Sequence, residues 1–103
     1  MALRHIALFR WRDGTTPDQV AEVEELLGAL PGSIPELAAY AFGPDTGIDA
    51  DQFDFAVVAD VADEASFVAY RDHPAHQAAL AFIRPLLAER AAVRFELPTM
   101  GGA

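Results

Sequence analysis

The sequence contains neither cysteine nor lysine, and these two absences exclude several kinds of chemistry. Without cysteine the chain has no thiolate nucleophile, no thiolate ligand for a metal and no disulfide bond. Without lysine it cannot form a Schiff base through a side-chain amine. Its two serines, Ser33 and Ser66, both lie outside a Gly-x-Ser-x-Gly nucleophile motif. Histidine, tyrosine, arginine and the carboxylates are the residues that remain for chemistry.

Positive charge is also scarce, since seven arginines face 16 acidic residues and the net charge is −9. Nucleic-acid binding needs a basic surface, so we expect no DNA or RNA partner. No apolar run approaches the roughly 20 residues that cross a membrane, and residues 1–5 lack the features of a signal peptide. We therefore expect a cytoplasmic protein without a membrane partner. Abundant Ala and Arg without Lys favours a bacterial source.

The length of 103 residues allows a single domain, covering residues 1–103, with a flexible tail expected at 98–103. Hydrophobic residues make up 52% of the chain, which is high for a domain of this size. A small domain cannot bury so much apolar surface by itself, so part of that surface is expected to contact a partner.

Residues 3–11 alternate as a strand does, and apolar side chains occupy the centre of both of its faces. A strand with one solvated face would alternate between apolar and polar residues, so this strand is expected to be covered on both sides. One face carries Leu3, His5, Ala7, Phe9 and Trp11, and the other carries Arg4, Ile6, Leu8 and Arg10.

Helix and strand signals divide the rest of the chain. Thr16 and Asp63 have the pattern of helix caps. His73-Pro74 separates two helices, and Pro85 is expected to weaken the last turns of the second one. The expected elements are helix 17–30, ended by Pro31-Gly32, strand 37–42, strand 53–61, helix 64–72, a helix opened by Pro74 with His76, Leu80, Ile83 and Leu87 on one face, and strand 91–97.

This order of elements is that of a ferredoxin-like βαββααβ protomer. We expect an α+β fold in which the helices lie on one face of an antiparallel four-stranded sheet. The helices are expected to cover Ile6 and Leu8, which leaves the face with His5 and Phe9 bare in a monomer. A homodimer through that open face would join two sheets into a dimeric α/β barrel with an interior space between them.

Two of the three histidines and one of the two tyrosines lie within seven residues, from Tyr70 to His76. The third histidine, His5, lies in the N-terminal strand. Imidazole titrates near neutral pH, so a fold that brought His5 to this segment would gather the groups suited to proton transfer. A zinc site made by the three histidines is an alternative, although the break at Pro74 separates His73 from the helix of His76.

The pattern Tyr70-x-x-His73-Pro74-x-His76 is quite specific, and four further segments accompany it. They are Arg4-His5-Ile6-Ala7-Leu8-Phe9-Arg10-Trp11, Ile34-Pro35-Glu36-Leu37, Gly43-Pro44 and Phe53-Asp54-Phe55. Together these segments resemble the Dabb family, the stress-responsive dimeric α/β-barrel domain, from His5 to Leu97. The resemblance implies a ferredoxin-like protomer and a homodimer whose sheets form a barrel.

One relative type in this family is the plant polyketide (olivetolic acid) cyclase, which closes a linear poly-β-keto thioester by an aldol condensation. In that type, the residues at the positions of His5 and His76 transfer protons, and the residue at the position of Tyr70 assists them. The chain departs from the cyclase at Phe55, where the cyclase carries a polar ring. The resemblance therefore implies the chemistry more strongly than the substrate.

The residues and the resemblance together favour a cofactor-free acid–base enzyme that acts on a small apolar carbonyl compound, by cyclisation, isomerisation or a lyase step. His5, Tyr70 and His76 are its candidate catalytic residues, and neither a metal nor a cofactor is expected. The pocket is expected to be lined by Ala7, Phe9, Phe42 and Phe55.

Two other functions stay open, so the sequence leaves undecided whether the protein is an enzyme. In the first alternative the protein is a non-enzymatic stress-responsive or ligand-binding dimer, in which His5 and His76 form structural hydrogen bonds and Tyr70 anchors its helix. In the second it is a monooxygenase of the kind that shares this dimeric barrel. His73 is expected to be structural, because it precedes Pro74 at the break between helices, where its ring can bond backbone groups.

Overall fold

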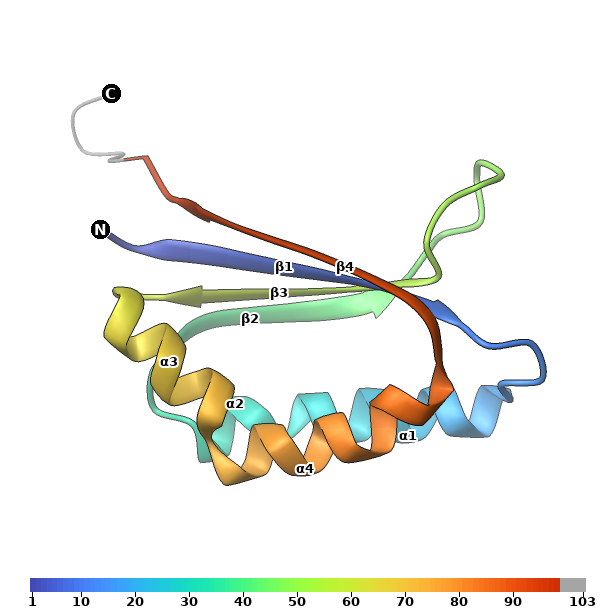
Figure 1. The fold of residues 1–103 in the computed structure, drawn as a ribbon, viewed down its shortest axis with the longest axis horizontal. Coiled ribbons are helices and arrows are strands. Elements are labelled where there is room, and N and C mark those ends of the chain that lie inside the picture. The colour runs from blue at the N-terminus through green and yellow to red at the C-terminus, as the bar shows by residue number, and fades with distance from the viewer. Residues whose placement is uncertain (99–103) are drawn as a thin grey trace.

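The structure, a computed structural model, places four strands in one sheet with the helices on one face of it (Figure 1). The strands lie in the order β2-β3-β1-β4, and each neighbouring pair is antiparallel. The ferredoxin-like α+β protomer predicted from the sequence is confirmed. Its elements are β1 (Leu3–Trp11), α1 (Pro17–Gly28), α2 (Leu30–Ser33), β2 (Leu37–Pro44), β3 (Phe55–Val61), α3 (Glu64–Asp72), α4 (Pro74–Ile83), η1 (Arg84–Leu86) and β4 (Leu87–Glu96).

The structure describes residues 1–98. The tail predicted at 98–103 therefore lies outside the described residues, apart from Pro98. Among the helices of this described part, none combines the length and the apolar character that crossing a membrane requires.

Side-chain caps set the starts of α1 and α3. Thr16 Oγ1 accepts a hydrogen bond from the backbone N–H of Gln19 at 3.2 Å, and the Gln19 side chain accepts one from Thr16 N–H at 2.9 Å. Asp63 accepts a hydrogen bond from the backbone N–H of Ser66 at 2.8 Å. Each cap satisfies N–H groups that a first helical turn leaves without a partner. Both helices therefore begin where the sequence predicts.

Two boundaries near prolines differ from the prediction. α1 ends at Gly28, and Pro31 belongs to the short helix α2, where a residue in the first turn needs no N–H partner. α4 ends at Ile83 because Pro85 lies in the 3₁₀ turn η1, and β4 begins at Leu87 rather than at residue 91. Leu87 is therefore a strand residue and does not share a helix with His76.

The sheet turns the opposite face toward the helices from the one predicted. His5, Ala7 and Phe9 are buried on the helix side, whereas Ile6 and Leu8 are half-buried on the other side. The prediction that the helices cover Ile6 and Leu8 is wrong, and so is the placement of His5 between two sheets. The pairing of β1 with β3 gives the physical reason, because the face with His5, Ala7 and Phe9 continues into a buried row that fills the space beneath the helices. That row is Phe55, Val57 and Ala59.

The other face of the sheet, named here the open apolar face, is apolar at its centre and has ion pairs at its ends. Arg4 pairs with Asp60 at 2.8 Å, and Arg10 pairs with Glu89 at 3.1 Å. Its apolar residues are Ile6, Leu8, Ala41, Ala56, Val58, Ala91, Val93 and Phe95. Figure 1 shows the described helices on the opposite side of the sheet, so no helix of residues 1–98 covers these side chains. The loop between β2 and β3 approaches only one end of the face, where it forms a hollow with Leu8 and Ala56.

Candidate active site

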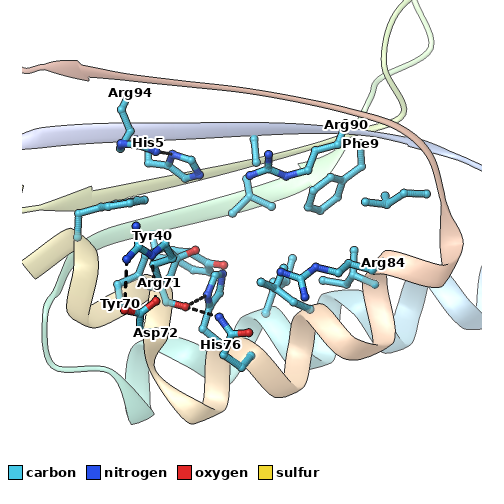
Figure 2. Close-up of a pocket in the computed structure, with 18 residues that line it drawn as sticks. His5, Phe9, Tyr40, Tyr70, Arg71, Asp72, His76, Arg84, Arg90 and Arg94 are labelled. Atoms are coloured by element: carbon cyan, nitrogen blue, oxygen red, sulfur yellow. Dashed lines mark hydrogen bonds and ion pairs between the residues drawn. The ribbon is translucent and has the colours of Figure 1, made fainter.

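A pocket of about 510 Å³ lies between the helix side of the sheet and the helices α3 and α4 (Figure 2). β1 supplies His5 to one wall. The end of α3 supplies Tyr70 to the opposite wall, and the first turn of α4 supplies His76. The three candidate catalytic residues thus line one pocket, which lies inside a protomer.

Two of the four apolar residues predicted to line the pocket do so, namely Ala7 and Phe9. Phe55 is 1% exposed and stacks on Phe42 with ring centroids 6.2 Å apart. Phe42 also packs beside Gly28 at the end of α1. Phe42 and Phe55 therefore belong to the core next to the pocket and not to its lining.

The break between α3 and α4 sets the position of His76. His73 has the backbone angles φ −60° and ψ 136°, which end α3, and its Nδ1 accepts a hydrogen bond from Ala75 N–H at 3.0 Å, which caps α4. Pro74 disfavours the helical conformation in the residue before it, so it enforces this break. His73 has the structural role that the sequence predicts, and the new helix direction brings His76 back against α3.

The hydrogen bond of His76 determines which of its ring nitrogens carries the proton. His76 Nδ1 lies 2.8 Å from the carbonyl oxygen of Arg71, at the end of α3. A carbonyl oxygen only accepts hydrogen bonds, so Nδ1 is the donor and Nε2 keeps a free lone pair. Gln77 Nε2 donates to the same oxygen at 2.7 Å, which further orients the carbonyl. Burial lowers the pKa of His76, and the arginines of the pocket lower it too, whereas the Arg71 carbonyl opposes them. His76 is therefore a neutral imidazole whose Nε2 lone pair is free to accept a proton.

His5, on the opposite wall, has the reverse arrangement. Its Nδ1 has a long contact of 3.5 Å with Arg94 Nη1, and a guanidinium group only donates, so this contact favours the tautomer in which Nδ1 accepts and Nε2 carries the proton. The residue is 7% exposed. Burial lowers the pKa of His5 to about 4, and the charges of Arg94 and Arg90 act in the same direction. At neutral pH His5 is thus a neutral hydrogen-bond donor, whereas His76 is a neutral acceptor.

A row of aromatic rings connects the two imidazoles along one side of the pocket. The ring centroids of His5 and Phe67 are 5.1 Å apart, those of Phe67 and Tyr70 are 6.1 Å apart, and those of Tyr70 and His76 are 4.4 Å apart. Burial raises the pKa of Tyr70, so its hydroxyl stays protonated at neutral pH. The row therefore fixes three polar groups in a largely apolar setting.

Tyr40, from β2, also lines the pocket, although sequence reasoning did not single it out. Its hydroxyl is buried beside the hydroxyl of Tyr70. Burial raises the pKa of Tyr40, and the neighbouring Tyr70 adds to the effect, so this hydroxyl stays protonated and is also a donor. The signal in the sequence is a polar-tipped side chain in an otherwise apolar strand.

Four arginines line the pocket, and sequence reasoning missed all of them. Arg71 pairs with its neighbour Asp72 at 2.9 Å. The other three are Arg84, Arg90 and Arg94. A usable signal was present, since three of the chain's seven cations fall within residues 84–94. The pocket is therefore more positive than the net charge of the chain indicates.

The three histidines do not form a common site. His73 lies outside the pocket, and its Nδ1 is occupied by the Ala75 N–H. Within the described residues, no group of three or more His, Cys, Asp or Glu side chains is placed to hold a metal ion. The alternative of a three-histidine zinc site therefore has no geometric support in this part of the chain.

The chain is similar to other proteins over most of its length. An uncharacterized protein of Streptomyces coelicolor is 33% identical over 84 residues, which are 80% of this chain and 87% of that protein. A crystal structure of a dimeric ferredoxin-like protein of unknown function from Thermobifida fusca YX is 60% identical, with a TM-score of 0.90 over 94% of this chain and 92% of that chain. A hydroxynitrile lyase from Passiflora edulis is 20% identical, with a TM-score of 0.84 over 94% of both chains.

The profile of one protein family matches residues 3–97, a range that includes every strand and helix from β1 to β4. This family is described as the stress responsive A/B barrel domain. The match covers all the residues that form the two walls of the pocket. The chain therefore belongs to the Dabb family.

Proposed function

We propose that this protein is an enzyme that transfers protons on a small carbonyl compound without a cofactor, and that it works as a homodimer. One observation carries the proposal. Two neutral imidazoles face one pocket from opposite walls, and one presents a lone pair while the other presents an N–H (Figure 2). Such a pair can remove a proton and stabilise the charge that develops.

His76 is the base in this proposal. Its Nε2 takes the proton from the carbon next to the substrate carbonyl, and the electron pair of the broken C–H bond moves to the carbonyl oxygen, which gives an enolate. The imidazolium that forms keeps its Nδ1–H bond to the Arg71 carbonyl, and both this bond and the charge of Asp72 favour the protonated ring. The lowered pKa keeps Nε2 unprotonated before the reaction, which a base at neutral pH requires.

The enolate oxygen needs hydrogen-bond donors, and three groups of the pocket are suited to this role. They are His5 Nε2–H and the hydroxyls of Tyr70 and Tyr40. Burial and the neighbouring Tyr70 keep the Tyr40 hydroxyl protonated, so it can donate to a substrate oxygen. Donors that are already in place stabilise developing charge at little reorganisation cost.

The enolate can be reprotonated at another carbon, attack a second carbonyl or lose a leaving group. These outcomes correspond to an isomerase, a cyclase and a lyase. The pocket volume of about 510 Å³ fits a small organic molecule. The hydroxynitrile lyase from Passiflora edulis has a similar fold, and its substrate class suggests a related step in which a base takes a hydroxyl proton, a carbonyl forms and cyanide leaves.

The homodimer is proposed to form through the open apolar face. The protein from Thermobifida fusca, which is 60% identical, is dimeric. Val93 and Phe95 on this face are 55% and 42% exposed in the protomer, so a partner has large apolar side chains to cover. The face carries no pocket residue at its centre, so each protomer would keep its own site.

Deuterium exchange tests the catalytic proposal. Phenylacetone in heavy water should exchange its acidic C–H protons faster with the protein than with an equal concentration of free imidazole, as followed by NMR. His76→Ala should lower this rate at least about 100-fold, because it removes the base. His5→Ala should also lower it, because it removes an enolate donor. Cleavage of mandelonitrile in the same variants, measured by the appearance of benzaldehyde, tests whether His76 can also take a hydroxyl proton, after which the C–CN bond breaks and cyanide leaves.

His73→Asn is the matched control, because it removes an imidazole outside the pocket while asparagine retains a capping oxygen. It should leave both rates unchanged. If the wild-type protein accelerates neither reaction, and His5→Ala and His76→Ala only lower the melting temperature, the residues are structural and the non-enzymatic alternative holds. Retention of full activity in His76→Ala would equally remove His76 as the base.

A further inference from the structure

The pocket collects positive charge from a chain that has little of it. Four of the seven arginines line the pocket, although the net charge is −9. The remaining three have partners elsewhere: Arg4 pairs with Asp60, Arg10 pairs with Glu89, and Arg12 donates to the carbonyl of Leu87. Concentration of cations in one cavity of an acidic protein indicates that the cavity needs positive charge.

The pocket arginines differ in what neutralises them. Arg71 forms an ion pair with Asp72. Arg94 lies over the ring of Phe67, 4.2 Å from its centroid, and contacts neutral His5. Within residues 1–98, Arg84 and Arg90 form no ion pair and no side-chain hydrogen bond with protein. Two guanidinium groups therefore face the pocket without a counterion from the described chain.

Arg84 and Arg90 approach the pocket from opposite walls. Arg84 lies in η1, directly after α4, and Arg90 lies on β4, opposite Phe9 of β1. Figure 2 shows both side chains extending into the space between the sheet and the helices. Arg90 enters from the sheet beside His5, and Arg84 enters from the helix side beside His76. Both arginines also help to keep His76 neutral, which places their charges within electrostatic reach of the proposed base. An anion between them would contact two guanidinium groups at once.

We infer that the pocket binds its substrate as a carboxylate, held between Arg84 and Arg90, with the carbonyl group placed between His76 and His5. This inference rests on the proposed function, because it names the substrate class of the same site. Guanidinium groups match carboxylates in a planar, bidentate geometry, and such charged hydrogen bonds are stronger than neutral ones. Neutralisation matters for the reaction as well, since an unscreened carboxylate would oppose formation of a nearby enolate.

The apolar residues of the pocket are also consistent with a small organic acid as the substrate. Leu80 and Leu87 line the same cavity as the two arginines, so the carbon skeleton of a small acid has apolar contacts. A neutral ketone would fill this apolar part and leave the two cations in contact with water alone. A keto acid or a related unsaturated acid satisfies both kinds of lining.

Binding of matched acids and amides tests the inference on the full-length protein. We would measure dissociation constants by calorimetry at low salt and pH 7.5 for benzoate and benzamide and for hexanoate and hexanamide. Each acid should bind at least about tenfold more tightly than its amide, because a hydrogen bond between two charged groups strengthens binding by about this factor relative to a bond with a neutral amide. The double variant Arg84→Gln/Arg90→Gln should abolish this preference, and Arg90→Lys should retain part of it.

Arg12→Gln is the matched control, since it removes one positive charge outside the pocket and should leave the preference unchanged. The inference is overturned if no acid binds better than its amide, or if the double variant keeps the preference. Stronger binding of phenyl phosphate than of benzoate would overturn the choice of a carboxylate in favour of a phosphate group. Binding is measured at equilibrium, so selective binding in His76→Ala without turnover in the wild type would support the inference while the proposed catalysis fails. Turnover of phenylacetone without any preference for acids would support the proposed catalysis and overturn the inference of a carboxylate substrate.

Discussion

His5 and His76 carry the same side chain but offer the pocket opposite hydrogen-bonding groups. The difference comes from one contact each, since a backbone carbonyl binds Nδ1 of His76 and an arginine binds Nδ1 of His5. Burial lowers the pKa of both rings, so neither is charged at neutral pH. At the scale of single residues, environment and not residue type therefore decides which ring presents a lone pair to the pocket and which presents an N–H.

The lowered pKa of His5 predicts a loss of stability in acid. Above about pH 6.5 both the folded and the unfolded states have neutral His5, whereas between about pH 6.5 and pH 4 only the unfolded state binds the proton. The free energy of unfolding should therefore fall as the pH drops through this window, by up to about 3 kcal/mol at pH 4. Urea denaturation at several pH values measures it.

His5→Gln should flatten this pH dependence, because glutamine does not titrate. The loss should not vanish, since the lowered pKa of His76 acts with the same sign. If His5→Gln loses as much free energy of unfolding between about pH 6.5 and pH 4 as the wild type does, His5 is not the residue that the fold keeps neutral.

At the scale of elements, the break between α3 and α4 organises the site. The last turn of α3 carries Tyr70 and the carbonyl of Arg71, and the first turn of α4 carries His76. A continuous helix would satisfy that carbonyl through its own backbone and would leave His76 without it. The break, which Pro74 enforces and the His73 side chain caps, therefore determines which ring nitrogen of His76 carries the proton.

Substitutions at His73 test this dependence. His73→Ala should lower the free energy of unfolding by about 1 kcal/mol, because it removes the side-chain cap of α4. His73→Asn should recover most of that stability, because an amide oxygen can accept the Ala75 N–H. Chemical denaturation of the three proteins under one condition measures the difference. Equal stabilities of the alanine and asparagine variants would show that the cap contributes nothing.

At the scale of the whole molecule, the two faces of the sheet differ. Its helix side forms one wall of the pocket, and its other side is the open apolar face (Figure 1). The chain is acidic, yet four of its seven arginines line the pocket. If the proposed interface and the proposed site are correct, assembly and catalysis can be perturbed independently.

A charge at the centre of the open apolar face should prevent assembly. Val58 pairs with Ile6 on one side and with Ala41 on the other, so Val58→Arg places an unpaired cation in the middle of the face. Light scattering after gel filtration should show a dimer for the wild type and a monomer for Val58→Arg. Val68→Arg, on the exposed side of α3, is the matched control and should stay dimeric. A monomeric wild type would disprove the interface.

Local patterns were enough to predict most elements. The caps at Thr16 and Asp63, the break before Pro74 and the alternation of residues 3–11 each depend on neighbours in the chain. The order of the elements predicted the ferredoxin-like topology, and the clustering of titratable side chains drew attention to His5, Tyr70 and His76; the resemblance to the Dabb family agreed with both. Whether these three residues are catalytic stays a prediction, although all of them line one pocket.

Only the tertiary structure decided which face of β1 meets the helices. Alternation divides a strand into two faces, but both faces of β1 are apolar at their centres, so the choice depends on the bulk that β3 places beside each of them. The same choice put His5 inside the protomer and brought Arg90 and Arg94 of β4 beside it. Contacts between strands that are distant in the chain set these positions, and no local pattern encodes them. The sequence by itself thus determined the elements and the reactive groups, whereas the fold decided where those groups meet.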